Sequence, residues 1–180
     1  MKKIILITFE VLLLLVISFT QARAESIACS SASRKNFQFS LVAPDNRITV
    51  LQNYLLKHNS PLITYAPLII EKSDQYKLFD WRLITAIAGV ESTFGKHIPV
   101  NSYNAWGIAN GNYYFSSWEE AIDYVSNLLK TKYVDKGLNS IDKIAPVYAP
   151  PSRTWSYKVK YFIREIALNQ RTQIEDLNLN

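Results

Sequence analysis

Glu91 is the residue of this sequence best placed to do acid-base chemistry. Apolar residues precede it at the spacing of one helix face, with Ile84 followed by Ile87 or Ala88. The carboxylate therefore continues an apolar stripe, and a carboxylate that loses water on such a face has its charged form disfavoured, so its pKa rises. A protonated glutamate near neutral pH can donate its proton to the leaving oxygen of a glycosidic bond.

The helix that carries Glu91 is expected to begin at Asp80, whose side chain can cap it, and to end between Thr93 and Gly95. The negative end of the helix dipole would then lie near the carboxylate and favour its protonated form. The alternative is a glutamate at a frayed helix end that points into solvent, which is the ordinary location for this residue type.

Five short motifs follow one another in the order E-S-T-F-G, S-Y-N-A-W-G, F-S-S-W-E-E-A-I, Y-A-P-P and W-S-Y-K-V. Their order resembles that of the lysozyme-like superfamily of glucosaminidases and lytic transglycosylases. Within it, the chain is most similar to the bacterial domains described as mannosyl-glycoprotein endo-beta-N-acetylglucosaminidase-like. The resemblance covers residues 60–167 and implies a lysozyme-like helical fold in which Glu91 is the catalytic acid.

The resemblance also implies roles for residues around the cleft. Ser92 would lie at the cleft floor, Asn104 to Trp106 would form the sugar-binding loop, and Tyr148 would face the catalytic glutamate. Two departures leave the substrate register and the product open: W-G-I-A stands where lytic transglycosylases usually have G-L-M-Q, and Y-A-P-P replaces Y-N-A-G. The predicted substrate-binding residues are Ser92, Ser102, Asn104, Ala105, Trp106, Tyr113, Tyr148 and Trp155.

No acidic residue occurs between Ser92 and Trp118. The usual glycoside hydrolase needs a second carboxylate across the scissile bond, and Asp123, Asp135 or Asp142 could supply it only if the fold brought one of them to the cleft. Two routes need one carboxylate: ring closure by a hydroxyl of the substrate, as in lytic transglycosylases, and assistance by the acetamido group. The missing acids favour ring closure, and hence anhydro-muramyl ends.

Helical periodicity and capping residues predict a mainly α domain for most of the chain. The segment between Thr93 and Ser116 lacks that periodicity and is rich in glycine, asparagine and aromatic residues, which predicts a loop and short-hairpin lobe forming one wall of the cleft. Its aromatic faces could stack on sugar rings, although aromatic residues more often pack in the core. Helices are predicted over residues 46–58, 67–78, 80–93, 118–129, 141–145 and 155–166. Their expected caps include Asp45 or Asn46 for the first, Ser117 with Glu120 as an S-x-x-E capping box for the fourth, and Ser140 for the fifth.

The N-terminal segment differs in composition from the rest of the chain. Two lysines, an apolar run to Phe19 and an A-R-A sequence are typical of a cleaved signal peptide, with an uncleaved membrane anchor as the alternative. Beyond it, residues 37–42 alternate as a short edge strand would. The predicted organisation is a signal peptide at 1–24, a mobile leader at 25–44, a lysozyme-like glycosidase domain at 45–170 and a polar tail at 171–180.

The chain has 180 residues, of which 48% are hydrophobic and 19% charged, enough for one globular domain with its own core. Removal of residues 1–24 would take three basic residues and one acidic residue from totals of 20 and 15, leaving a net charge of +3. A mildly basic exported domain could be drawn to anionic wall polymers. Cys29, the only cysteine, excludes an intrachain disulfide and is interpreted as a free thiol, with a lipid anchor as the alternative.

No cofactor, metal or nucleic-acid partner is predicted, because His58 and His97 lack the spacing of a zinc helix and no glycine-rich phosphate loop is present. The leading interpretation is a secreted or envelope-associated monomeric enzyme that cleaves β-1,4 bonds of peptidoglycan or a related N-acetylglucosamine-containing glycan. The alternatives are a non-catalytic cell-wall glycan-binding module and a surface interaction domain whose aromatic residues belong to the core.

Overall fold

The structure is a computed structural model that describes residues 45–178. The predicted signal peptide, the leader with its edge strand, and Cys29 lie outside the described residues. The described part contains helices and loops and no β-strand, so the prediction of a mainly α fold is confirmed. No helix of this part is both long and apolar enough to span a membrane. Its α-helices are α2 (Asn46–Lys57), α3 (Ala66–Gln75), α4 (Leu83–Ser92), α5 (Trp118–Leu128), α6 (Ile141–Tyr148) and α7 (Trp155–Asn178).

Three of these helices begin at the side-chain caps that the sequence predicts. The side chains of Asp45, Ser117 and Ser140 each accept a hydrogen bond from a backbone N–H of the first helical turn. The predicted capping box before α5 is present in a shifted form, since the carboxylate of Glu120 accepts from the N–H of Ser116, at 2.7 Å, rather than from that of the cap residue.

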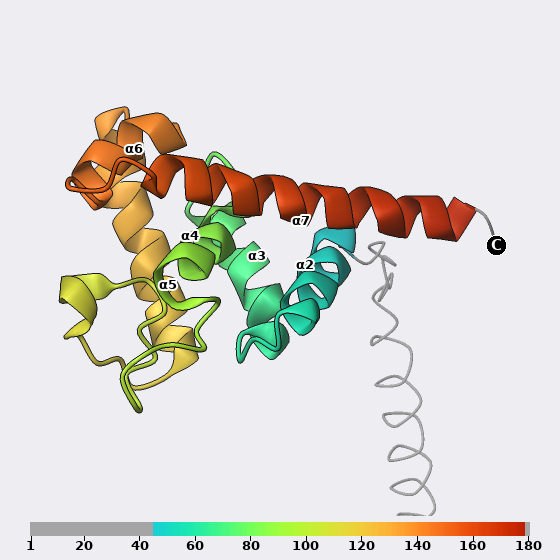
Figure 1. Cartoon of the computed structure of the whole chain (residues 1–180), viewed down its shortest axis with the longest axis horizontal. Helices are drawn as coiled ribbons and strands as arrows, with labels where there is room; N and C mark the ends of the chain where they lie inside the picture. Colours follow the sequence, from blue (N-terminus) through green and yellow to red (C-terminus); the bar gives the residue numbers. More distant parts are fainter. Residues whose placement is uncertain (1–44, 179–180) are drawn as a thin grey trace, which may run out of the picture. The chain divides into compact units, whose positions relative to one another are not determined.

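Helix α4 forms the centre of the core. Eight of its ten residues are buried, and Leu83, Ile84 and Ile87 have no exposed surface. Helix α7 packs against α4 and α2, and α3 packs against α4, α5 and α2, so α4 is enclosed by other helices (Figure 1). Because α4 is apolar on nearly all sides, burial fixes its position, and with it the position of Glu91 in its last turn.

Helix α4 begins at Leu83, three residues later than predicted. The carboxylate of Asp80 accepts from the backbone N–H of Arg82 at 2.9 Å and from its Nε at 2.8 Å, while the Asp80 carbonyl accepts from the N–H of Leu83. Asp80 therefore closes a turn in front of the helix, because its side chain bonds a donor that lies outside the first helical turn.

Helices α6 and α7 both continue beyond their predicted ends. Helix α6 runs through Pro146 to Tyr148, because the proline removes only its own N–H bond and the N–H of Ala149 still bonds the carbonyl of Ala145 at 3.0 Å. This extra turn carries Tyr148 toward the end of α4. Helix α7 continues to Asn178, so the segment predicted as a polar tail is helical over most of its length.

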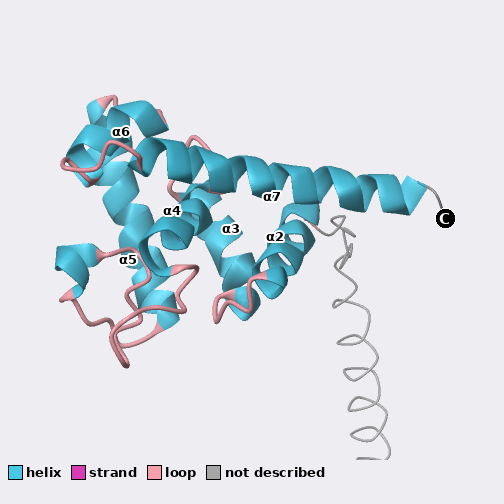
Figure 2. Cartoon of the chain, viewed as in Figure 1, coloured by secondary structure: helices cyan, strands magenta, loops and turns pink. Residues whose placement is uncertain are grey.

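The segment between α4 and α5 is an irregular loop, and the predicted short hairpin is not formed (Figure 2). It contains one short 3-10 turn at Ile108–Gly111, and the N–H of Phe115 bonds the carbonyl of Ser102 at 2.9 Å. Paired strands need extended backbone, and several residues of this loop instead adopt left-handed conformations. Those outside glycine are Thr93, Phe94, Asn101, Tyr103, Ala109 and Asn110.

A close approach of α4, α7 and the loop after α4 depends on Gly89. A Cβ at this position would lie 2.6 Å from Cε1 of Phe94 and 2.9 Å from Cδ2 of Phe162. The two rings meet edge to face over the glycine, with centroids 5.0 Å apart. The absence of a side chain therefore lets α7 and the start of the loop pack directly on the backbone of α4.

We expect Gly89→Ala to destabilise the protein by about 1–3 kcal/mol, because an added methyl group in this contact forces both rings to move. Helix propensity alone predicts the opposite sign, a gain of about 1 kcal/mol. Urea denaturation decides between the two effects. Combining the change with Phe162→Leu should recover part of the loss, whereas equal or higher stability of Gly89→Ala would show that the contact is loose.

Candidate active site

A cavity of about 530 Å³ opens at the C-terminal end of α4, and we call it the Glu91 pocket. Its walls come from three parts of the fold: the last turn of α4, the short turn at Ile108–Gly111 with the glycine before it, and the end of α6 with the turn that follows. The residues that line it are Glu91, Gly107, Asn110, Gly111, Tyr148, Ala149, Pro150 and Pro151.

The two carboxylate oxygens of Glu91 are in different environments. Oε1 accepts a hydrogen bond of 2.7 Å from the indole N–H of Trp155, the first residue of α7. Oε2 lies against the backbone of Gly107, where an added Cβ would be 3.0 Å away. Among the described residues no hydrogen bond reaches Oε2, so one oxygen is held by the protein and the other is available at the pocket.

Gly107 is required at its position for two reasons. Its φ of +67° lies in the left-handed region, and its lack of a side chain leaves space for the Glu91 carboxylate. The same backbone carries the chain from the buried Trp106 into the turn that forms the pocket wall.

An aromatic pair supports the carboxylate from the side of α6 and α7. The ring of Trp155 is 3% exposed and stacks on Tyr148, with centroids 4.8 Å apart and planes 25° apart. The hydroxyl of Tyr148 donates to the carbonyl of Trp106 at 2.6 Å. Burial and the nearby charge of Glu91 raise the pKa of Tyr148 well above its usual range, so its hydroxyl stays protonated as a donor.

Burial of the carboxylate raises the pKa of Glu91, as the sequence predicted. The side chain is exposed at the pocket, while Trp155 bonds one of its oxygens and the backbone of Gly107 lies close to the other. The hydrogen bond from Trp155 and the positive charge of Lys158 both stabilise the ionised form, and they oppose the effect of burial without cancelling it. Glu91 is thus a reachable carboxyl group with a raised pKa.

Five residues predicted to contact substrate have buried side chains, so direct contact with a ligand is contradicted for all of them except Trp106, which also lines a cavity. The Ser92 hydroxyl lies 2.9 Å from the carbonyl of Ala105 and accepts from the N–H of Gly95, so it fastens the loop to the end of α4. The Trp106 indole donates to the carbonyl of Ile84 inside the core. The buried residues are Ser92, Ser102, Asn104, Ala105 and Trp106.

Asn104 organises the loop that forms the pocket wall. Its amide group donates to the carbonyls of Ile108 and Tyr113, at 2.9 and 3.0 Å, and its carbonyl accepts from the N–H of Ile108. The N–H of Asn104 itself donates to the buried hydroxyl of Ser102. These bonds satisfy the polar groups of a loop without regular structure, so Asn104 and Ser102 shape the site indirectly.

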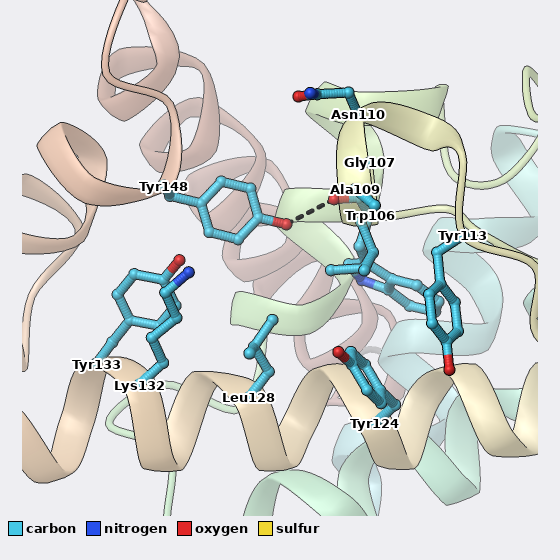
Figure 3. Close-up of a pocket in the computed structure, with 11 residues that line it drawn as sticks. Trp106, Gly107, Ala109, Asn110, Tyr113, Tyr124, Leu128, Lys132, Tyr133 and Tyr148 are labelled. Carbon is cyan, nitrogen blue, oxygen red and sulfur yellow. Dashed lines mark hydrogen bonds between the residues drawn. The ribbon is translucent and has the colours of Figure 1, made fainter.

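The other predicted residues do lie at pockets or at the carboxylate. Tyr148 lines the Glu91 pocket, and Trp155 bonds Glu91 directly. Tyr113 lines a second cavity of about 370 Å³, which we call the tyrosine pocket (Figure 3). The two cavities share Gly107, Asn110 and Tyr148. The tyrosine pocket is lined by Trp106, Gly107, Ile108, Ala109, Asn110, Tyr113, Tyr124, Leu128, Lys132, Tyr133 and Tyr148.

Sequence reasoning missed the contribution to this site of α5 and of the turn at Leu129–Tyr133 that continues it. Tyr124, Leu128 and Lys132 recur at intervals of four, and Figure 3 shows them projecting from one side of the helix toward the loop. The spacing was visible in the sequence. The stronger periodic signal in this helix is that of its buried, mainly apolar side.

The three aspartates considered as a second carboxylate all lie in ion pairs away from both pockets. Asp123 pairs with Lys72, Asp135 with Lys130, and Asp142 with Lys160. Glu91 is the one carboxylate among the residues that line the two cavities. The described part of the chain also contains no cluster of three or more histidine, cysteine, aspartate and glutamate side chains that could hold a metal ion.

No protein-family model and no curated protein matches the chain. The chemistry of the site and the ordered sequence motifs around Glu91 are therefore the features that bear on its function.

We expect Glu91→Gln to raise the melting temperature at pH 7 by about 2 °C, with the difference vanishing near pH 3. Because the folded pKa of Glu91 is raised, the wild-type protein is stabilised by the protonated carboxyl at low pH and loses that contribution as pH rises through the folded pKa. The effect is worth less than about 1 kcal/mol, since the group is partly exposed. Thermal unfolding of both proteins between pH 3 and 7 tests this, and a less stable variant at pH 7 would contradict it.

Proposed function

We propose that this protein is a glycan-cleaving enzyme that cuts β-1,4 bonds of peptidoglycan strands, with Glu91 as its acid and base. The observation that carries the proposal is the state of the Glu91 carboxyl. It combines a raised pKa, one oxygen fixed by Trp155 and a second oxygen open to a cavity of about 530 Å³. A general acid needs this combination of a retained proton, a fixed orientation and access to substrate.

In the proposed reaction, Glu91 donates the proton on Oε2 to the oxygen that leaves the anomeric carbon. As that carbon-oxygen bond breaks, positive charge develops on the sugar ring and the carboxylate becomes negative. The indole N–H of Trp155 then stabilises the new negative charge, since a hydrogen bond to an ionised carboxylate is stronger than one to a neutral group.

The second half of the reaction has to proceed without another carboxylate, because no second acid lines either pocket. We propose that a hydroxyl of the same sugar bonds to the anomeric carbon and gives its proton to Glu91, which restores the acid and leaves an anhydro ring. An attached nucleophile is favoured, since it is already at high effective concentration. The protein itself would then supply one carboxylate, one indole donor and the cavity.

Two further features support this substrate class. The adjoining tyrosine pocket presents flat aromatic faces of the kind that pack on sugar rings, including a stacked pair, Tyr113 and Tyr124, with centroids 5.5 Å apart. The ordered motifs around Glu91 resemble those of lysozyme-like enzymes that act on such glycans. The predicted signal peptide would place the enzyme outside the membrane, where peptidoglycan lies.

We expect Glu91→Gln to lower the rate of cleavage of purified cell wall by about 100-fold or more, the range that a general acid contributes. Glu119→Gln is the matched control, since Glu119 is an exposed glutamate at the start of α5. Activity of Glu91→Gln within tenfold of wild type would reject Glu91 as the acid. Glycan binding by a wild-type protein that cleaves nothing would instead define a binding module.

Trp155→Phe should move the alkaline limb of the pH-rate profile to higher pH. The indole N–H lowers the pKa of Glu91, so its removal raises that pKa further and keeps the acid protonated over a wider range. The wild-type limb should itself lie above the ordinary glutamate value of about 4.3. Initial rates between pH 4 and 9, with melting curves to confirm folding, measure the shift, and a limb that moves downward would contradict the assignment.

The product distinguishes ring closure from hydrolysis. We expect digested glycan strands to carry anhydro-muramyl ends, which borohydride cannot reduce, whereas hydrolysis leaves reducing ends that take up hydride. Mass spectrometry before and after reduction measures the two populations. If every new end gains hydride, water is the nucleophile, and the acetamido group of the substrate would be the remaining one-carboxylate route.

A further inference from the structure

The tyrosine pocket contains a single charged side chain, Lys132. The ten other residues that line the pocket are uncharged, and four of them are tyrosines. Lys132 is exposed and lies beside Tyr133, on the side of the helix that faces Tyr148 (Figure 3). The pocket is therefore a cavity rich in aromatic residues, with one positive charge and no acidic side chain.

The charge of Lys132 is not used by the fold. Among the described residues no carboxylate lies within ion-pair distance of it, and the nearby Asp135 pairs with Lys130 instead. The Lys132 ammonium lies 5.8 Å from the ring centroid of Tyr133, close enough for a cation-π contact. That contact keeps the ammonium on the side of the helix that faces the pocket while leaving its hydrogen-bond donors free.

The backbone at this position is also unusual. Residues Leu129–Tyr133 form a π turn between α5 and the following 3-10 turn at Val134–Lys136. A π turn widens the helix by one residue, so that both Lys132 and Tyr133 reach the pocket together with Leu128. Such turns are rare and occur often at functional sites.

We infer that the tyrosine pocket binds a sugar unit that bears a carboxylate, and that Lys132 pairs with that carboxylate. The inference rests on the proposed function, and it makes Lys132 a specificity-determining residue that favours glycans with acidic substituents over uncharged N-acetylglucosamine polymers. Gly107, Asn110 and Tyr148 line both cavities, so a strand whose bond lies at Glu91 continues into the tyrosine pocket. In peptidoglycan the carboxylate can belong to the lactyl group of the sugar or to the attached peptide.

The experiment measures binding in the Glu91→Gln background, where turnover does not interfere. Isothermal titration uses a peptide-free tetrasaccharide of alternating N-acetylglucosamine and N-acetylmuramic acid, and the same compound with its carboxyl groups reduced to alcohols. Reduction should weaken binding about fivefold to tenfold, as expected for loss of one charge-assisted contact. Adding Lys132→Met should weaken binding of the acidic compound by the same factor and make the two compounds equivalent, and Lys132→Arg should retain most of the preference.

The matched control is Lys136→Met, which removes an exposed lysine four residues later that lines neither pocket. It should leave both dissociation constants unchanged. The preference for the acidic compound should also weaken as salt rises from 50 to 500 mM in the Glu91→Gln protein and be insensitive to salt after Lys132→Met. A tetrasaccharide carrying its peptides, in which the lactyl carboxyl is amidated, tests the source: retention of Lys132-dependent binding assigns the peptide carboxylate, and its loss assigns the lactyl group.

Two results overturn the inference. The first is equal affinity of the acidic and reduced compounds together with no effect of Lys132→Met on binding of the peptide-bearing tetrasaccharide. The second is an acid preference that survives Lys132→Met. Wall cleavage by the protein with Glu91 intact is scored separately. Cleavage with no role for Lys132 in binding refutes the subsite and leaves the proposed enzyme in place. Lys132-dependent binding without cleavage refutes the enzyme and leaves the subsite.

Discussion

The hydrogen bond from the Trp155 indole to Glu91 joins the end of α4 to the start of α7, and the rest of the site depends on it. At 2.7 Å it fixes one carboxylate oxygen and thereby the direction of the other. The indole is held in turn by its stack on Tyr148, whose hydroxyl bonds the backbone beside Gly107. Three segments far apart in the sequence are thus connected through one carboxylate, so its geometry is set by the packing of the whole domain.

Two opposing effects set the protonation of this group. Burial favours the neutral acid, and the indole N–H and Lys158 favour the anion. A group held only by burial would keep its proton well but would be poorly stabilised after giving it up. A group held by several donors would be ionised before the reaction. One donor on one oxygen keeps the pKa raised and would still stabilise the carboxylate that the proposed proton transfer produces.

The sequence predicted the helical class, three helix caps and the end of the central helix, because these depend on local periodicity and short-range hydrogen bonds. It could not assign the roles of Trp106 and Asn104, since a tryptophan in a loop is consistent with either stacking on a ligand or filling a core. Their roles are determined by their hydrogen bonds in the folded chain. The indole of Trp106 donates to the carbonyl of Ile84, and the side-chain amide of Asn104 donates to two carbonyls of its own loop. Lys132 was missed for the related reason that a solvated lysine and a pocket lysine look alike in sequence.

The end of α4 shows how the fold places a strained backbone beside the acid. Thr93 and Phe94 have φ values of +54° and +60°, a conformation that costs about 1–2 kcal/mol for a residue with a Cβ. Phe94 offsets that cost by burial against Phe162 and His58, with ring centroids 5.0 and 4.5 Å away, and its N–H bonds the carbonyl of Ala88. Tertiary packing therefore ends the helix one residue after Glu91 without a glycine at the cap. Because the chain reverses there, the loop can return Gly107 to the carboxylate, so the strain and the position of the acid have a common structural origin.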